Sequence, residues 1–168
     1  MLSDYLNEVA IKEVMSGDRS GCHNSAHWFK VSQLGTLIAL AEGVDPVVPL
    51  LFGFYHDCRR ENDGFAPNHS HRAALLALNH SHRGLLNISQ DQLTLLMFAC
   101  EHHTKGSVDS EDKVVSACWD ADRLDLPRVG VQTLPEFLGT DTAKSLCEHQ
   151  KDMYSYAYRD GAEVYGRP

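Results

Sequence analysis

Ten histidines among 168 residues are the feature of this sequence that points most directly to chemistry. They are spread from His23 to His149, and several stand in pairs or beside a carboxylate, as in His56-Asp57. Imidazole and carboxylate groups together suit borderline divalent metals such as manganese, iron, nickel and zinc. A tag would gather its histidines in one run, so this spread favours a metal centre.

The first two groups of candidates combine useful spacing with an apolar setting. His23 and His27 are four residues apart, so a helix places them on one face, as two ligands or as one ligand and one substrate contact. His56-Asp57 ends a strongly apolar stretch, and a metal ion would offset the high energy of a buried carboxylate. The structural alternatives are a histidine pair without a ligand role and a simple His-Asp hydrogen bond.

Two later groups also follow apolar stretches. His102 and His103 are adjacent, and both can face one direction only where a helix unwinds at its end. Asp120 and Asp122 lie about 200° apart on a helix, so we expect only one of them to be a ligand. A surface position for the histidines, and an Asp-Arg salt-bridge network around Arg123, are the alternatives.

The elements that must position these residues are helices joined by short loops, and strand-like alternation is absent. We expect an all-α fold, a single compact domain of about six to seven helices over residues 1–168. The expected helices cover residues 3–15, 25–42, 46–57, 68–80, 90–103, 111–122 and 142–159, the last lying within about 141–160.

Helix-capping signals set these boundaries. Ser89 with Gln92 predicts a capping box, and Asn24 or Ser25 opens the second helix. Ser110 is expected to cap the helix that leads to Asp122, and Asp141 or Thr142 to cap the last one.

Bulk properties narrow the partners. Hydrophobic residues make up 43% of the chain, charged residues 23%, and the net charge is -8. An acidic surface repels nucleic-acid backbones and anionic membranes, so we expect neither as a partner. The N-terminus does not look like a signal peptide, and the five widely spaced cysteines suggest reduced thiols. These features predict a cytoplasmic location.

The order of the motifs resembles the HD-domain superfamily of metal-dependent phosphohydrolases, over roughly residues 20–130. Residues 23–31 resemble the opening segment, with Asn24 and Lys30 in place of the usual Asp and Arg. Residues 54–57 resemble the helix-ending His-Asp, 69–74 the His-x-x-Arg-Gly-Ala segment, and 121–124 the closing Ala-Asp-Arg-Leu. Cys58-Arg59-Arg60 replaces the usual Ile-Gly-Lys after Asp57.

The resemblance implies one or two divalent ions per chain, of manganese, iron, nickel, magnesium or zinc. It selects Asp122 over Asp120, and it implies that His27, His56, Asp57 and Asp122 hold the first ion. His69 and the pair His102-His103 would hold a second ion or contact phosphate.

The remaining roles follow from the same resemblance and from position in the sequence. Asp57, His102, His103 and Arg123 are the candidate catalytic groups. The candidate substrate contacts are His23, Arg72 and Lys105.

The function implied is hydrolysis of a phosphorylated small molecule, such as a phosphomonoester or nucleotide. An oxidative di-iron enzyme on the same scaffold is the main alternative, and a non-catalytic ligand-binding module is a further one. The final helix, with Tyr154, Tyr156 and Tyr158, could pack on the core or on a second copy in a homodimer.

Overall fold

The structure is a computed structural model that describes residues 2–19, 21–104 and 110–149. Over these ranges it is all-α, as the sequence predicts, with a single isolated β-bridge between Leu6 and Leu86. In chain order the elements are α1 (Leu2–Tyr5), α2 (Glu8–Met15), α3 (Ser25–Ala41), α4 (Val47–Tyr55), α5 (His69–His82), α6 (Gln90–His102), α7 (Lys113–Leu124), the 3-10 turns η1 (Leu126–Val129) and η2 (Pro135–Phe137), and helical residues 141–149.

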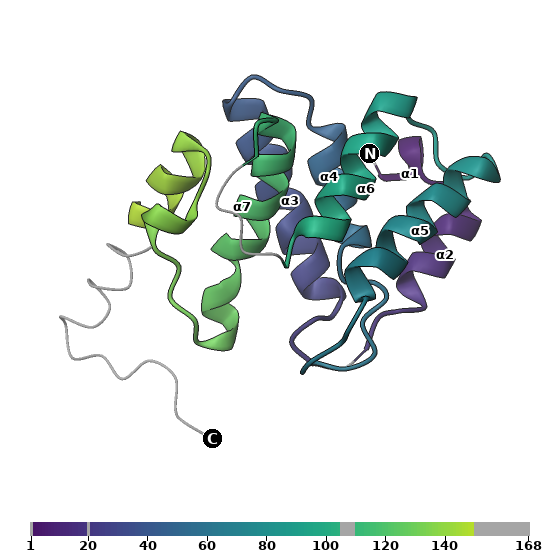
Figure 1. Cartoon of the computed structure of the whole chain (residues 1–168), viewed down its shortest axis with the longest axis horizontal. Coiled ribbons are helices and arrows are strands. Elements are labelled where there is room, and N and C mark those ends of the chain that lie inside the picture. Colours follow the sequence, from purple (N-terminus) through teal and green to yellow (C-terminus); the bar gives the residue numbers. More distant parts are fainter. Residues whose placement is uncertain (1, 20, 105–109, 150–168) are drawn as a thin grey trace.

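Helix α4 is the centre of the fold. It packs against α3, α5, α6 and α7. Figure 1 shows α3 between α7 on one side and α4 and α6 on the other, with α5 and α2 beyond them. Seven of the nine residues of α4 are buried, because its sequence is apolar on every face. A helix of this kind can exist only inside the molecule, so the residues at its end are held firmly.

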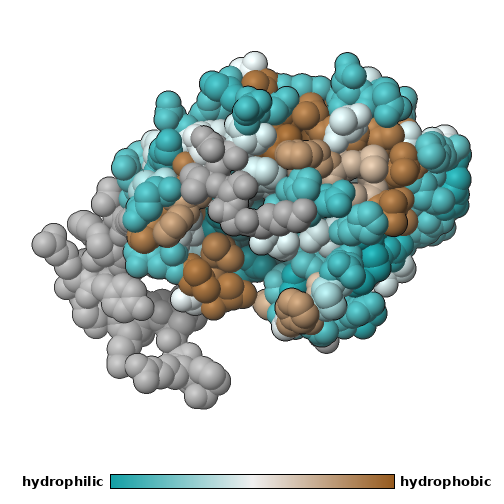
Figure 2. Space-filling view, viewed as in Figure 1, coloured by the Kyte–Doolittle hydropathy of each residue, from teal (hydrophilic) through white to brown (hydrophobic). Residues whose placement is uncertain are grey.

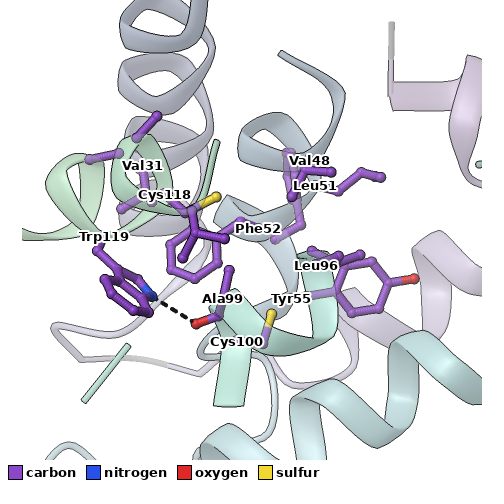
Figure 3. Close-up of a cluster of buried hydrophobic side chains, with 14 of the residues drawn as sticks. Val31, Val48, Leu51, Phe52, Tyr55, Leu96, Ala99, Cys100, Cys118 and Trp119 are labelled. Carbon is purple, nitrogen blue, oxygen red and sulfur yellow. Dashed lines mark hydrogen bonds between the residues drawn. The ribbon is translucent and has the colours of Figure 1, made fainter. Parts of the chain in front are cut away.

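The core around α4 draws on four helices. Val31, Phe52, Leu96 and Trp119 come from α3, α4, α6 and α7 and lie together in Figure 3, and all are at most 4% exposed. The indole Nε1 of Trp119 donates a hydrogen bond of 3.0 Å to the carbonyl of Ala99, which ties α7 to α6. This packing fixes the helix ends that carry the candidate ligands.

Helices α3 and α4 approach unusually closely at Gly53. A Cβ at this position would lie 2.4 Å from the backbone nitrogen of Ser32, which no real side chain allows. The Ser32 hydroxyl donates a hydrogen bond of 2.8 Å to the carbonyl of Leu50 across the same contact. The close approach sets the separation between the start of α3 and the end of α4.

Two predicted helix starts agree with the structure. The Asn24 side chain accepts hydrogen bonds from the backbone nitrogens of Ala26 and His27, and so caps α3. Ser89 and Gln92 form both bonds of a capping box at α6. Each site satisfies backbone N–H groups that the first helical turn leaves without partners.

Three helix boundaries differ from the prediction: a break in the first helix, the start of α7 and the start of the final helix. The expected first helix over residues 3–15 is interrupted, because Asn7 caps a new helix through the Val9 nitrogen. Asp112, not Ser110, caps α7 by accepting a bond of 2.8 Å from the Val114 nitrogen.

The final helix begins after Thr140, whose hydroxyl accepts from the Ala143 nitrogen, instead of at the predicted caps Asp141 or Thr142. The Thr142 hydroxyl donates a hydrogen bond to the carboxylate of Glu42, which is the C-cap residue of α3. The predicted part of this helix beyond residue 149 lies outside the described residues.

In the described ranges, no helix has the length and apolar character needed to cross a membrane. Figure 2 shows polar side chains over most of the face in view, with apolar patches between them.

Candidate metal centre

The candidate ligands gather where five helix ends meet. His27 lies in the first turn of α3, His56 and Asp57 directly follow α4, and His69 begins α5. His103 follows α6, and Asp122 lies in the last turn of α7. The starts of α3 and α5 and the ends of α4, α6 and α7 therefore share one side of the molecule, although they are far apart in sequence.

A first group consists of His27, His56 and Asp57, all buried and with ligand atoms within 4.8 Å of one another. The Nδ1 atom of His56 lies 3.0 Å from the Gly53 carbonyl and 3.1 Å from the Phe52 carbonyl. A carbonyl can only accept, so Nδ1 carries the proton and Nε2 presents a lone pair. Burial lowers the pKa of His56 to about 4, which keeps the ring neutral.

His27 presents its lone pair to the same point. Its Nδ1 lies 2.8 Å from Asp125 Oδ2, so this nitrogen donates to the carboxylate. The two Nε2 atoms of His27 and His56 are 3.1 Å apart. With both rings neutral, two lone pairs would face each other at this distance and repel, and a cation between them would remove the repulsion.

Asp122, rather than Asp120, reaches this group. Its Oδ1 lies 3.4 Å from Nε2 of His27 and 3.7 Å from Nε2 of His56. Asp120 points away and accepts hydrogen bonds from the Gly139 nitrogen and from Thr140. The helical separation of the two aspartates explains why only one of them faces the histidines.

A second group consists of Asp57, His69 and His103. The Nδ1 atoms of His69 and His103 each lie 2.7 Å from a backbone carbonyl, of Ala66 and Cys100 respectively. Both Nε2 atoms therefore present lone pairs, at 3.2 and 3.5 Å from Asp57 Oδ1. The repeated use of carbonyls to orient imidazoles is typical of metal-ligating histidines.

Asp57 joins the two groups, because its oxygens face different histidines. Oδ2 lies 3.6 Å from Nε2 of His56 and 3.8 Å from that of His27, whereas Oδ1 faces the second group. Burial by itself raises the pKa of Asp57, whereas the surrounding histidines, His56 and His103 foremost, lower it well below its usual range when their rings carry a second proton. The carboxylate is therefore ionised.

The residues fit a divalent metal. Asp57 is 3% exposed, and among the described residues no group donates a hydrogen bond to its Oδ1. An ionised, buried oxygen without a donor is energetically costly, and a metal ion would complete its coordination. The donor set of imidazole nitrogens and carboxylate oxygens is that of manganese, iron, nickel and zinc.

Arg60 and His23 form the rim of the centre. The Nη1 atom of Arg60 lies 3.1 Å from Nε2 of His69 and 3.6 Å from Asp57 Oδ1. His23 places Nε2 3.9 Å from Asp57 Oδ2. A polar pocket of about 530 Å³ opens here, lined by Gly17, Arg19, His23, Arg60, Glu61, Asn62 and Asp63.

Other candidates lie apart from both groups. The ring of His102 packs on Phe98, with 4.4 Å between ring centroids, and His102 belongs to neither group of ligand atoms. Its place is taken by His103. Adjacent helical residues point about 100° apart, so the pair cannot share one direction while the helix continues through His102.

Two predicted arginines hold the backbone instead. Arg72 donates to the carbonyls of Pro67 and Arg59, each at 2.9 Å, and so fastens the loop before α5. Arg123 donates to the Phe137 carbonyl and lies 3.8 Å from Asp120. The predicted contact Lys105 lies outside the described residues.

Sequence reasoning did not single out Asp125 or Asp63. Asp125 orients His27, and Asp63 lies 2.9 Å from Nδ1 of His23. The signal for Asp125 was present, because it follows Asp122 by three residues and so shares its helix face. Asp63 lies in a loop, where spacing carries no such information.

Comparison with known proteins supports the fold. No family model matches the sequence, and no curated protein matches it. A solved structure described as a predicted HD superfamily hydrolase, from an uncultured Thermotogales bacterium, superimposes with a TM-score of 0.73 at 19% identity. The match covers 90% of this chain and 88% of the other. The chain therefore has the helical fold of a predicted HD superfamily hydrolase, as its motif order predicts.

Proposed function

We propose that this protein is a metal-dependent hydrolase that acts on a phosphorylated small molecule. The observation that carries the proposal is the position of Asp57, with one oxygen facing His27 and His56 and the other facing His69 and His103. A carboxylate in this position suits two ions that share it. The fold of a predicted HD superfamily hydrolase supports the same conclusion.

The ions would be held by His27, His56 and Asp122 on one side of Asp57 and by His69 and His103 on the other. A bound divalent ion activates water for attack and polarises a phosphoryl oxygen. The residues around it keep the imidazoles in the ligating tautomer, through Asp125 and through backbone carbonyls. These partners also prevent the rings from rotating away.

Arg60 is the positive group best placed to bind a substrate phosphate. It lies against the second group of ligands and lines the polar pocket, and its side chain is only 14% exposed. A guanidinium matches the geometry of a phosphate with two parallel N–H groups. We assign to Arg60 the contact with phosphate that the resembling segments suggested for Arg72 and Arg123.

The test is a panel of phosphomonoesters and nucleotides, assayed with metal-free protein to which manganese, nickel, iron, magnesium or zinc is added. We expect phosphate release that depends on the metal. Arg60→Gln should raise KM by about tenfold or more, the equivalent of one charged hydrogen bond. Arg59→Gln is the matched control, because Arg59 bonds to the Glu13 carbonyl and does not line the pocket.

A di-iron oxidative enzyme is the second candidate, since two ligand groups that share one carboxylate also suit a pair of iron ions. Elemental analysis and oxygen consumption separate the two functions. Iron content with oxygen uptake, and no phosphate release with any metal, would replace the hydrolase proposal. If both Asp57→Ala and His56→Ala still bound metal as well as the wild type, the assignment of the metal site would be overturned.

A further inference from the structure

A third group of ligand atoms lies at the rim of the centre, outside the two groups that share Asp57. It consists of Cys22, His23 and Asp63. Cys22 Sγ lies 3.2 Å from His23 Nδ1 and 3.3 Å from Asp63 Oδ1, and His23 Nδ1 lies 2.9 Å from the same oxygen. One sulfur, one nitrogen and one oxygen atom thus form a nearly equilateral triangle.

The size of this triangle matches one face of a tetrahedral zinc site. Zinc bonds of about 2.3 Å to sulfur and about 2.0–2.2 Å to nitrogen or oxygen put neighbouring ligand atoms about 3.3–3.6 Å apart. The three observed separations are shorter than this by a few tenths of an ångström. Small side-chain rotations would therefore open the triangle around an ion.

The backbone is adapted to bring Asp63 to this position. Gly21 has a φ of +145°, and a Cβ there would lie 1.9 Å from Asp63 Oδ2. The backbone nitrogens of Cys22 and His23 both bond to Asp63 Oδ1, at 3.1 and 3.2 Å. Hydrogen bonds from His23 and then Cys22 lower the pKa of Asp63 to about 2, so the carboxylate carries its charge at neutral pH.

We propose that Cys22, His23 and Asp63 bind a zinc ion, with water as the fourth ligand from the polar pocket. The ion replaces the thiol proton, which is released to solvent, so that a Zn–S bond forms as the S–H bond breaks. Thiolate, imidazole and carboxylate together favour zinc over the hard cations magnesium and calcium. The proposal does not depend on the hydrolase assignment.

Zinc at this site would act on the neighbouring centre through His23. Coordination occupies Nδ1, so the ring proton must lie on Nε2, the nitrogen that is 3.9 Å from Asp57 Oδ2. His23 becomes a fixed hydrogen-bond donor at the rim of the centre. The ion also joins the start of α3 to the loop that contains Asp63, in addition to the hydrogen bonds between Asp63 and residues 22 and 23.

Cobalt(II) titration of the full chain tests the site directly, because a cobalt–thiolate bond gives near-ultraviolet charge-transfer absorption. The two central groups contain no sulfur, and the other four cysteines are buried. We expect this absorption in the wild type and in Asp122→Asn, which alters only the central groups. Cys22→Ser should lose it and should bind one fewer equivalent of zinc.

Alkylation provides a second readout. Zinc should slow the reaction of Cys22 with iodoacetamide by at least about tenfold, and a chelator should restore the rate, because coordination occupies the thiolate. Asp63→Asn should abolish this protection. The proposal is overturned by the absence of the charge-transfer band at saturating cobalt, by its persistence in Cys22→Ser, or by unchanged alkylation with zinc. None of these results bears on phosphate release.

Discussion

His56 and His80 are both fully buried, yet the two regions around them differ in one respect that separates a structural histidine from a ligand. The ring nitrogens of His80 both have hydrogen-bonding partners, since Nδ1 lies 2.7 Å from the Tyr55 hydroxyl and Nε2 lies 3.0 Å from Glu13 Oε2. His56 has carbonyl partners for Nδ1 alone, and its Nε2 faces the Nε2 of His27.

The difference shows that burial does not identify a metal ligand. Burial lowers the pKa of both histidines, so both rings are neutral at physiological pH. What differs is the direction in which the remaining lone pair points. In His80 the polar network is complete, whereas Nε2 of His56 faces Nε2 of His27 and the carboxylates of Asp57 and Asp122.

The largest effect should come from removing the residue common to both ligand groups. Asp57→Ala should abolish metal-dependent turnover and should lower metal affinity by more than the roughly 100-fold that loss of a ligand's hydrogen-bond partner costs, so that metal content falls. Metal analysis and phosphate release measure the two effects. Unchanged metal content in this variant would contradict the assignment of a metal site beside His56, and so the distinction between His56 as a ligand and His80 as a structural histidine.

His80→Ala should have the opposite pattern. Loss of the ring leaves the Tyr55 hydroxyl buried without its partner, so the free energy of unfolding should fall by about 1–3 kcal/mol. Metal content per folded protein should stay at the wild-type value. Urea denaturation checks the stability, and His56→Ala is the matched variant, in which metal content falls. Loss of metal in His80→Ala would mean that its network also supports the centre.

A smaller effect is expected at Asp125. Asp125→Asn retains an oxygen that accepts from His27 Nδ1 but removes the negative charge, so metal affinity should fall by about tenfold. Competition with a chromogenic chelator measures this change. Asp141→Asn is the control, because Asp141 lies 99% exposed at the start of the last helix. Equal affinities in the two variants would show that Asp125 does not position His27.

The smallest effect concerns pH. Hydrogen bonds from Arg83 and then His80 lower the pKa of Glu13 from 4.5 to about 2. Its stabilising contribution is therefore complete above pH 4.5 and is lost as the pH falls towards 2. Glu13→Gln should lower Tm by roughly 1–3 °C at neutral pH, and the difference should shrink at pH 3. A difference that grew on acidification would have the wrong sign.

Periodicity and capping signals were enough to predict the helical fold, because α3 to α6 each carry a clear start or an apolar pattern. They failed at the first helix, where pairing of Leu6 with Leu86 accompanies a break at Asn7. That contact joins residues far apart in the chain, so no local pattern could reveal it. The division into a single domain over 1–168 stays a prediction.

At the centre, the structure brings most of the predicted ligands together, and the assignment of each ligand stays a prediction. His27, His56, Asp57, His69 and Asp122 come together as the resemblance implies. The choice of His103 over His102 depends on where α6 ends, and sequence signals place helix ends only to within a residue or two. Arg60 could not be distinguished from Arg72, since that depends on how the loop between α4 and α5 folds.

The close approach at Gly53 has a consequence for how substitutions in this protein should be interpreted. Any side chain there would push α3 away from α4, and His27 lies on α3 while His56 directly follows α4. A mutational scan that measures metal loading would therefore mark position 53 together with the ligands, although its backbone touches no ion. Position 43, where a Cβ would meet nothing, should tolerate alanine in the same scan far better, with only its left-handed φ of +71° opposing it.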